Sequence, residues 1–238
     1  MRTTTLALIT VAALAATASA ADFSKPAPLA GLDNVKRAEL LAARQSWPDA
    51  VAAYKAAIAA SPLDAVLRNR VGICYQRMGD ARAARASYTK AIDLNKNYAE
   101  AYNNLGTLDH ARGKYKQAIA AYGKAIQLQP KDAAFHKNLG SAWLARGDVD
   151  KALEAWGEAF RLDPVTFESA AVKVPGTGIS LATQYYLYAK LLAARGEVEK
   201  AFEYLTKAQA AGFNAFEKLE SDRDFATIVK DPRYAALK

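Results

Sequence analysis

The chain has 238 residues, of which 52% are hydrophobic and 24% are charged, a balance that excludes a disordered protein. Its 32 basic and 24 acidic side chains give a net charge of +8, which favours acidic partners or anionic surfaces. Alanine is frequent, as in residues 81–86, and it is the best helix former. The composition therefore predicts an all-α protein.

The N-terminal segment 1–20 contains the three parts of a secretory signal peptide. Arg2 supplies a positive charge, residues 6–16 form an uncharged apolar run, and residues 18–20 read Ala-Ser-Ala, a small-residue cleavage site. The apolar run is shorter than the roughly 20 residues that span a bilayer. We expect a cleaved signal peptide at 1–20, a linker at 21–30 and a periplasmic or secreted protein. The alternative is that this segment remains as an N-terminal anchor.

Export and the rest of the sequence bear on the class of partner. An exported chain leaves the cytosol, which argues against nucleic acid as a partner. After Ala20 no apolar segment is long enough to span a membrane, so we expect no transmembrane span after signal cleavage.

The sequence repeats itself with a period of about 34 residues. Proline follows a helical pattern at Pro62, Pro130 and Pro164, with Lys96 in the intervening slot. Other slots recur with the same period, and they hold a turn glycine (Gly79, Gly113, Gly147, and later Gly196), a helix glycine (Gly72, Gly106, Gly140), an alanine (Ala84, Ala118, Ala152) and an aromatic residue (Tyr88, Tyr122, Trp156). Such self-similarity indicates an array of helical hairpins.

Each slot has a physical role in a pair of antiparallel helices. The turn glycine ends the first helix in a left-handed conformation, and proline ends the second helix. The helix glycine and the alanine lie where the two helices cross closely, while the aromatic residues fill the gap between neighbouring pairs. One pair cannot bury its apolar face alone, so stability depends on stacking.

This pattern resembles the tetratricopeptide repeat, in an exported bacterial form. The resemblance implies an α-solenoid, a right-handed superhelix of antiparallel helix pairs in which the first helix of each pair, helix A, faces a shared groove. The repeats are placed at 31–64, 65–98, 99–132 and 133–166. An inserted loop at 167–181, a degenerate fifth repeat at 182–212 and a C-terminal helical cap at 213–238 complete the predicted organisation.

Two regions depart from the period. The insert contains Pro175-Gly176-Thr177-Gly178, which predicts a loop; it lacks the spacing and the lysine of a phosphate-binding loop, and it stays a candidate contact region. In the tail, four apolar residues are expected to seal the end of the stack: Phe225, Ile228, Tyr234 and Leu237.

The sequence offers little for catalysis. His110, His136 and Cys74 are not arranged at metal-ligand spacing, and no cofactor fingerprint is present. His136 occupies an aromatic packing slot, and Cys74, the only cysteine, is expected to be buried and inert. We predict no enzyme, no catalytic residue, no metal and no cofactor. An enzyme carried by the insert or the tail is a third possibility that lacks a nucleophile or a ligand set.

Binding is the more informative prospect. The stripe of helix A opposite its packed side should line the concave groove, and it supplies a polar, mildly basic set: Asn69, Gln76, Arg77, Asn103, Asn104, Thr107, His110, Lys137, Asn138, Ser141, Tyr186 and Lys190. Such a surface suits an extended peptide with acidic or carbonyl groups. The alternative is that these residues only keep the face soluble.

The family also contains proteins that clamp a chaperone C-terminus by its carboxylate. Only Asn104 agrees with that pattern here, so this activity is not predicted. The sequence favours a non-enzymatic scaffold or adaptor that binds a protein or peptide partner, and its positive net charge favours an acidic one. The alternative is a structural or self-oligomerising envelope protein whose groove has no peptide ligand.

Overall fold

The computed structural model describes residues 31, 33–165 and 180–237. The predicted signal peptide at 1–20, the linker at 21–30 and nearly all of the insert at 167–181 lie outside the described residues.

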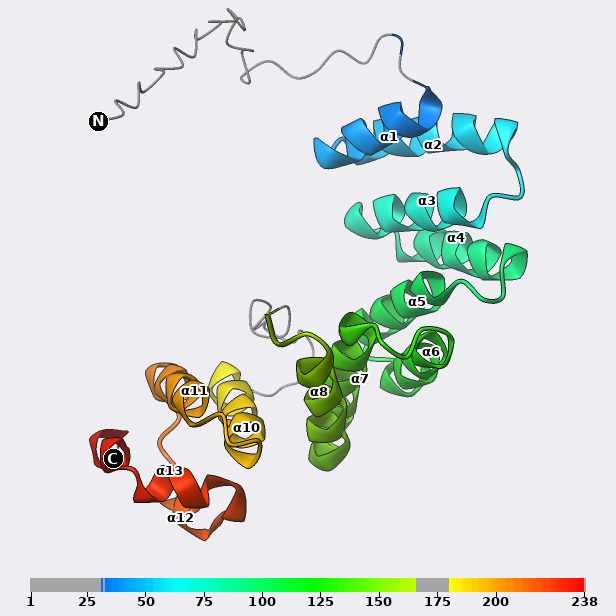
Figure 1. Ribbon diagram of the computed structural model, residues 1–238. Coiled ribbons are helices and arrows are strands. Elements are labelled where there is room, and N and C mark those ends of the chain that lie inside the picture. The colour runs from blue at the N-terminus through cyan, green and yellow to red at the C-terminus, as the bar shows by residue number, and fades with distance from the viewer. Residues whose placement is uncertain (1–30, 32, 166–179, 238) are drawn as a thin grey trace, which may run out of the picture.

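Every regular element in these ranges is a helix, and five antiparallel pairs follow one another along the chain (Figure 1). The pairs are α1 (Asn34–Ala43) with α2 (Trp47–Ala60), α3 (Ala65–Arg77) with α4 (Ala81–Leu94), α5 (Ala99–Ala111) with α6 (Tyr115–Leu128), α7 (Ala133–Arg146) with α8 (Val149–Leu162), and α10 (Leu181–Ala194) with α11 (Val198–Ala210). Each pair packs against the next. The predicted all-α solenoid is confirmed.

In the α3–α4, α5–α6 and α7–α8 pairs the two helices approach closely because helix A has a glycine where they cross. A Cβ atom on Gly72 would lie 2.5 Å from the Tyr88 ring, and one on Gly140 would lie 2.4 Å from the Trp156 ring. Gly106 faces Tyr122 in the same way. The ring on the second helix of the pair, helix B, therefore occupies the volume that any larger residue on helix A would need.

The turn glycines adopt the backbone conformation that their slot predicts. The φ angles of Gly79, Gly113 and Gly147 are +81°, +72° and +93°. In the first pair the equivalent residue is Gln45, which has a φ of +60°. The turn geometry is thus kept where the sequence departs from glycine.

Aspartates begin several of the helices, as capping predicts. Carboxylates of Asp64, Asp80 and Asp148 each accept a hydrogen bond from a backbone N–H in the first turn of the helix that follows, at 2.9 to 3.3 Å. Each bond satisfies one of the N–H groups that the first turn of a helix leaves unpaired.

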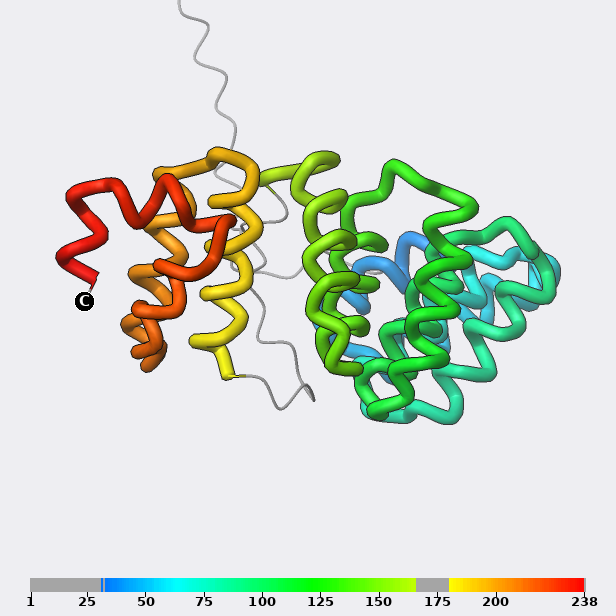
Figure 2. The backbone as a smooth tube through the Cα atoms, turned by 90° about the horizontal axis from the view of Figure 1, so that it is seen from below, coloured from blue at the N-terminus to red at the C-terminus, as the bar shows by residue number. Residues whose placement is uncertain are grey.

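The tail folds back on the last pair. It consists of α12 (Glu217–Ser221), the 3₁₀ segment η1 (Arg223–Phe225), α13 (Ala226–Lys230) and the 3₁₀ segment η2 (Pro232–Leu237). Figure 2 shows this tail and the α10–α11 pair on one side of α8 and the first three pairs on the other. The four apolar residues expected to seal the stack, Phe225, Ile228, Tyr234 and Leu237, are all buried.

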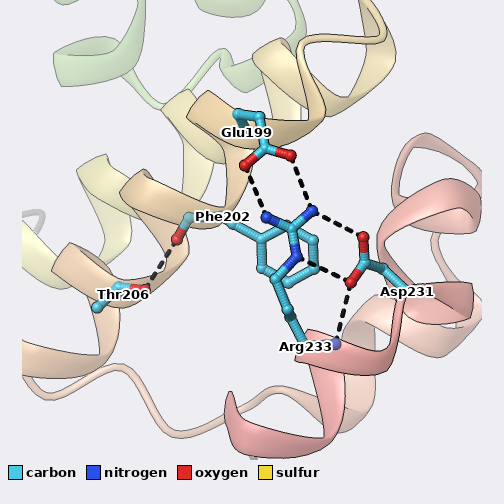
Figure 3. Close-up of polar contacts among 5 residues, drawn as sticks. All are labelled: Glu199, Phe202, Thr206, Asp231 and Arg233. Atoms are coloured by element: carbon cyan, nitrogen blue, oxygen red, sulfur yellow. Dashed lines mark hydrogen bonds and ion pairs between the residues drawn. The ribbon is translucent and has the colours of Figure 1, made fainter.

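One arginine anchors the end of the tail, as Figure 3 shows. Arg233 donates hydrogen bonds to both carboxylate oxygens of Glu199, at 2.6 and 3.0 Å, and to Asp231 at 2.8 and 2.9 Å. Its guanidinium also lies over the ring of Phe202, 4.3 Å from the centroid. These contacts attach η2 to α11.

Two further expectations concern the thiol and the membrane. Cys74 is 2% exposed, and burial raises the pKa of its thiol, which confirms the expected buried residue. No helix in 31, 33–165 and 180–237 has the length and apolar character that crossing a membrane would require.

Candidate functional site

Side-chain hydrogen bonds join the A helices of consecutive pairs along the predicted groove. The amide of Asn104 on α5 donates to the carbonyl oxygen of Asn69 on α3 at 2.9 Å, and Asn138 on α7 donates to Asn103 on α5 at 2.8 Å. Between α1 and α3, Arg70 forms an ion pair with Glu39. These contacts fix four A helices side by side.

Asn69 belongs to this framework and does not line the surface. It is 4% exposed, and its amide also donates to the hydroxyl of Tyr98 at 3.2 Å. Its carbonyl oxygen and its amide are therefore both occupied within the protein, which leaves them unavailable to a partner.

The aromatic slot of helix B supports the groove from behind. The hydroxyl of Tyr88 donates to Gln76 at 2.7 Å, and the hydroxyl of Tyr122 donates to Thr107 at 3.2 Å. In the fourth pair the indole of Trp156 donates to the backbone carbonyl of Lys137 at 3.1 Å. Burial raises the pKa of Tyr122 to about 12, so its hydroxyl keeps its proton at neutral pH. Gln76 and Thr107 are held in place by these bonds.

Two basic residues remain on the described groove of α3 and α7. Arg77 is exposed at the end of α3, while Lys137 is half-buried on α7. Burial lowers the pKa of Lys137 to about 8. The hydroxyl of Ser141 donates to the backbone carbonyl of Lys137 at 3.1 Å, which places Ser141 one turn further along the same face. The α7 face thus combines an amine and a hydroxyl.

His110 is the predicted groove residue near the end of α5. It is half-buried, and burial lowers the pKa of its imidazole, which favours the neutral ring. The ring packs against Tyr115 with centroids 5.4 Å apart. His110 therefore contributes shape rather than charge to the end of α5.

The fifth pair differs, because the tail covers the predicted groove residues of α10. Lys190 forms ion pairs with Asp222 at 2.6 Å and Asp224 at 3.4 Å, and the Tyr186 ring stacks on Phe213 with centroids 4.6 Å apart. Burial lowers the pKa of Lys190, but the two carboxylates outweigh this effect and leave it raised. The open part of the groove therefore ends at α7.

The sequence did not predict one ion pair that has a buried carboxylate. Asp109 is 3% exposed and pairs with Arg85 on α4. Asp109 occupies the position that holds Tyr75 and Trp143 in the neighbouring repeats. An acidic residue at this otherwise aromatic position is the sequence feature that could have predicted the ion pair. This pair ties α4 to α5.

Two pockets lie at equivalent places in different repeats. The larger, about 560 Å³, lies between α6, α7 and α8, and the other, about 470 Å³, lies on α1 and α2. Trp143 and Leu139 line the larger pocket beside His136, whose Nε2 lies 2.9 Å from the carbonyl oxygen of Pro130. In the described ranges no group of three or more His, Cys, Asp or Glu side chains could hold a metal ion.

The middle of the chain matches known repeat families. Models described as tetratricopeptide repeat match residues 65–98 and 87–120, and one described as TPR repeat matches residues 106–145. No curated protein matches the chain in sequence.

Several solved structures share the fold. PilF from Pseudomonas aeruginosa is 20% identical, with 85% of this chain and 86% of that chain covered and a TM-score of 0.58. MamA is 24% identical, with 73% and 93% covered and a TM-score of 0.53. YrrB, described as a TPR protein with an unusual peptide-binding site, is 21% identical, with 83% and 90% covered and a TM-score of 0.51. Residues 65–145 of this chain are therefore tetratricopeptide repeats, and the chain shares the fold of these structures.

Proposed function

We propose that this chain is a non-enzymatic scaffold that binds an extended protein or peptide segment along the A helices of its first four pairs. The observation that carries the proposal is the set of side-chain contacts that fixes α1, α3, α5 and α7 side by side. A rigid face of four parallel helices presents a binding surface without an ordering cost at the moment of binding.

The chemistry of this face suits a peptide backbone and carboxylates. Thr107 and Ser141 are partly exposed hydroxyls, and Arg77 and Lys137 supply the positive charge. Cations recognise carboxylates through charge-assisted hydrogen bonds, so we propose an acidic partner segment. The peptide-binding site in the description of YrrB, whose fold this chain shares, agrees with this proposal.

The location of the activity is part of the proposal. Residues 1–20 have the sequence of a signal peptide, so we propose that the scaffold works after export, in the periplasm or outside the cell. An adaptor in an envelope assembly fits this location.

Photo-cross-linking at single positions tests the groove. A photoreactive side chain replaces Ala111 on α5 or Ala134 on α7, both exposed on the proposed face, and Ala120 on α6 is the control because it is exposed on a B helix. We expect the same partner adduct from the two groove positions and none from Ala120. Lys137→Glu should abolish the adduct.

Two results would contradict the proposal. Equal adducts from all three positions would place the partner outside the groove. An adduct formed only with a second copy of this chain would favour the alternative, a self-oligomerising protein, and light scattering would then show a concentration-dependent mass.

A further inference from the structure

The positive charge of the molecule is concentrated in two of its helix pairs. Residues 65–132 contain 12 basic and 5 acidic side chains, whereas the other described ranges, 31–64, 133–165 and 180–237, together contain 16 basic and 17 acidic side chains. The α3–α4 and α5–α6 pairs therefore account for the basic surplus of the described chain.

Much of this surplus stands on the two turns that join helix A to helix B. Five exposed cations surround these turns, and we call them the basic edge: Arg77, Arg82, Arg112, Lys114 and Lys116. No ion pair within the described residues holds any of the five, whereas the nearby Arg70, Arg85 and Lys96 are each paired with a carboxylate. One carboxylate, Asp80, lies in these turns, and it caps α4 through Ala83.

The two turns lie on the same side of the solenoid. In Figure 1 the turns of the α1–α2 and α3–α4 pairs are on the left, and the connections to the following pairs are on the right. The α5–α6 pair stacks on α3–α4, with α5 in contact with both helices, so its turn continues the same edge. The basic edge is therefore one patch built from two consecutive repeats.

The shape of the basic edge favours a flat partner over an extended peptide. The cations stand at protruding turns, and both pockets described above are lined by other residues. Met78, at the centre of the first turn, is 44% exposed. Flexible cations around an exposed apolar side chain fit the headgroup region of a bilayer, where each basic residue near an anionic surface adds to the attraction.

We propose that the basic edge docks the solenoid on an anionic lipid bilayer, with Met78 entering the headgroup region. The docked solenoid leaves most of the groove face of α5 and α7 free for a partner. This second surface overlaps with the groove at one of its five cations, Arg77, and the test variant below leaves Arg77 unchanged.

Vesicle co-sedimentation of the full chain tests the proposal, with phosphatidylcholine vesicles that contain or lack phosphatidylglycerol. The apolar run at residues 6–16 adds to binding on both vesicles, so the preference for anionic vesicles is the quantity measured. The test variant is Arg82→Glu with Lys116→Glu. Both positions are in the first turn of a helix, α4 or α6, where an acidic residue favours the helix, so folding is not at risk.

The matched control is Lys90→Glu with Lys124→Glu. These residues lie on the same two helices, also at equivalent positions of consecutive repeats and with the same change in net charge, but away from the turns. We expect the test variant to lose at least about tenfold in partitioning to anionic vesicles, and the control to lose far less. Binding of the wild type should also weaken as salt is raised.

Three outcomes would overturn the proposal. One is equal partitioning of the wild type to both kinds of vesicle. Another is equal loss by the two variants, which would make net charge and not the edge responsible. In the third outcome, the wild type binds polyglutamate but not the anionic vesicles, and the test variant no longer binds polyglutamate. This result would assign the basic edge to an acidic protein.

Discussion

Gln45 occupies the turn position that Gly79 holds one repeat later, and both have a left-handed backbone, with φ of +60° and +81°. A side chain in this region is disfavoured by contact between its Cβ atom and the following carbonyl. Gln45→Gly should therefore stabilise the protein by about 0.5–1 kcal/mol in urea unfolding. Gln127→Gly, in the last turn of α6 and without a left-handed backbone, is the control and should destabilise, by up to about 0.5–1 kcal/mol. A loss of stability in both variants would show that the left-handed backbone of Gln45 is not strained.

The contact between Gly140 and Trp156 allows the helix crossing to be tested. Gly140→Ala should destabilise the protein by about 1–3 kcal/mol, because the new methyl group overlaps the indole ring. Gly123→Ala is the control, since nothing lies within 4 Å of its added Cβ atom, and it should stabilise by about 0.4–1 kcal/mol. Thermal unfolding of the two variants should move in opposite directions, and a shift in the same direction would contradict the crossing geometry.

Asn69 allows the contacts between A helices to be measured. Asn69→Ala removes the hydrogen bonds that Tyr98 and Asn104 make with this buried side chain. The variant should lower the free energy of unfolding by about 1–3 kcal/mol. Asn97→Ala, at an exposed turn position, should change stability by less than about 0.5 kcal/mol. Chemical denaturation compares the two, and equal stabilities would show that the buried amide contributes nothing.

Lys137 should react with acetic anhydride at lower pH than an ordinary lysine. Its pKa of about 8 means that about half of its side chains are neutral, and hence nucleophilic, at pH 8. An amine with the usual pKa near 10.5 is almost wholly protonated there. Competition labelling against a lysine model peptide, read by mass spectrometry, should give a midpoint near pH 8. A midpoint above pH 10 would show that burial does not affect this amine.

The Arg233 anchor should make the stability of the tail depend on acid. The contacts with Arg233 lower the pKa of Asp231 from 3.8 to about 2 and also lower the pKa of Glu199. A carboxylate whose pKa is depressed by folding stabilises the fold above its unfolded value and loses this effect as pH falls through the folded value. Arg233→Ala should therefore lower the melting temperature at pH 7, and the difference from wild type should shrink between pH 4 and pH 2.

The control for this effect is Arg223→Ala, an exposed arginine of η1 whose side chain makes no ion pair within the described residues. It should leave the melting temperature nearly unchanged at both pH values. A difference between wild type and Arg233→Ala that stays constant down to pH 2 would contradict the role of the carboxylates.

Local spacing was enough to predict the repeat architecture. The turn glycines adopt the left-handed φ that their slot requires, and the helix glycines meet the aromatic slot at the crossings, as Gly72 and Tyr88 do. These features repeat because each hairpin solves the same packing problem, so several copies can be read together.

The groove was harder to predict because helix periodicity does not fix exposure. Asn69 is on the predicted stripe, but the close approach of α3 and α5 buries it. Tyr186 and Lys190 are also on the stripe, but the tail, which comes after the last helix pair, covers them. Contacts between neighbouring helices and with distant segments are not encoded in a single period of the repeat.

The covered face of α10 gives the array a direction. Lys190 and Tyr186 already contact the tail, so the A helix of the last pair, α10, is covered. A hairpin added after Leu237 could therefore not extend the groove beyond α10. A duplicated hairpin inserted ahead of α10 would instead pack between the apolar faces of α8 and α10, which now contact each other, and would lengthen the groove. The solenoid can therefore become longer by duplication of an internal hairpin, without any change in the tail that covers its last pair.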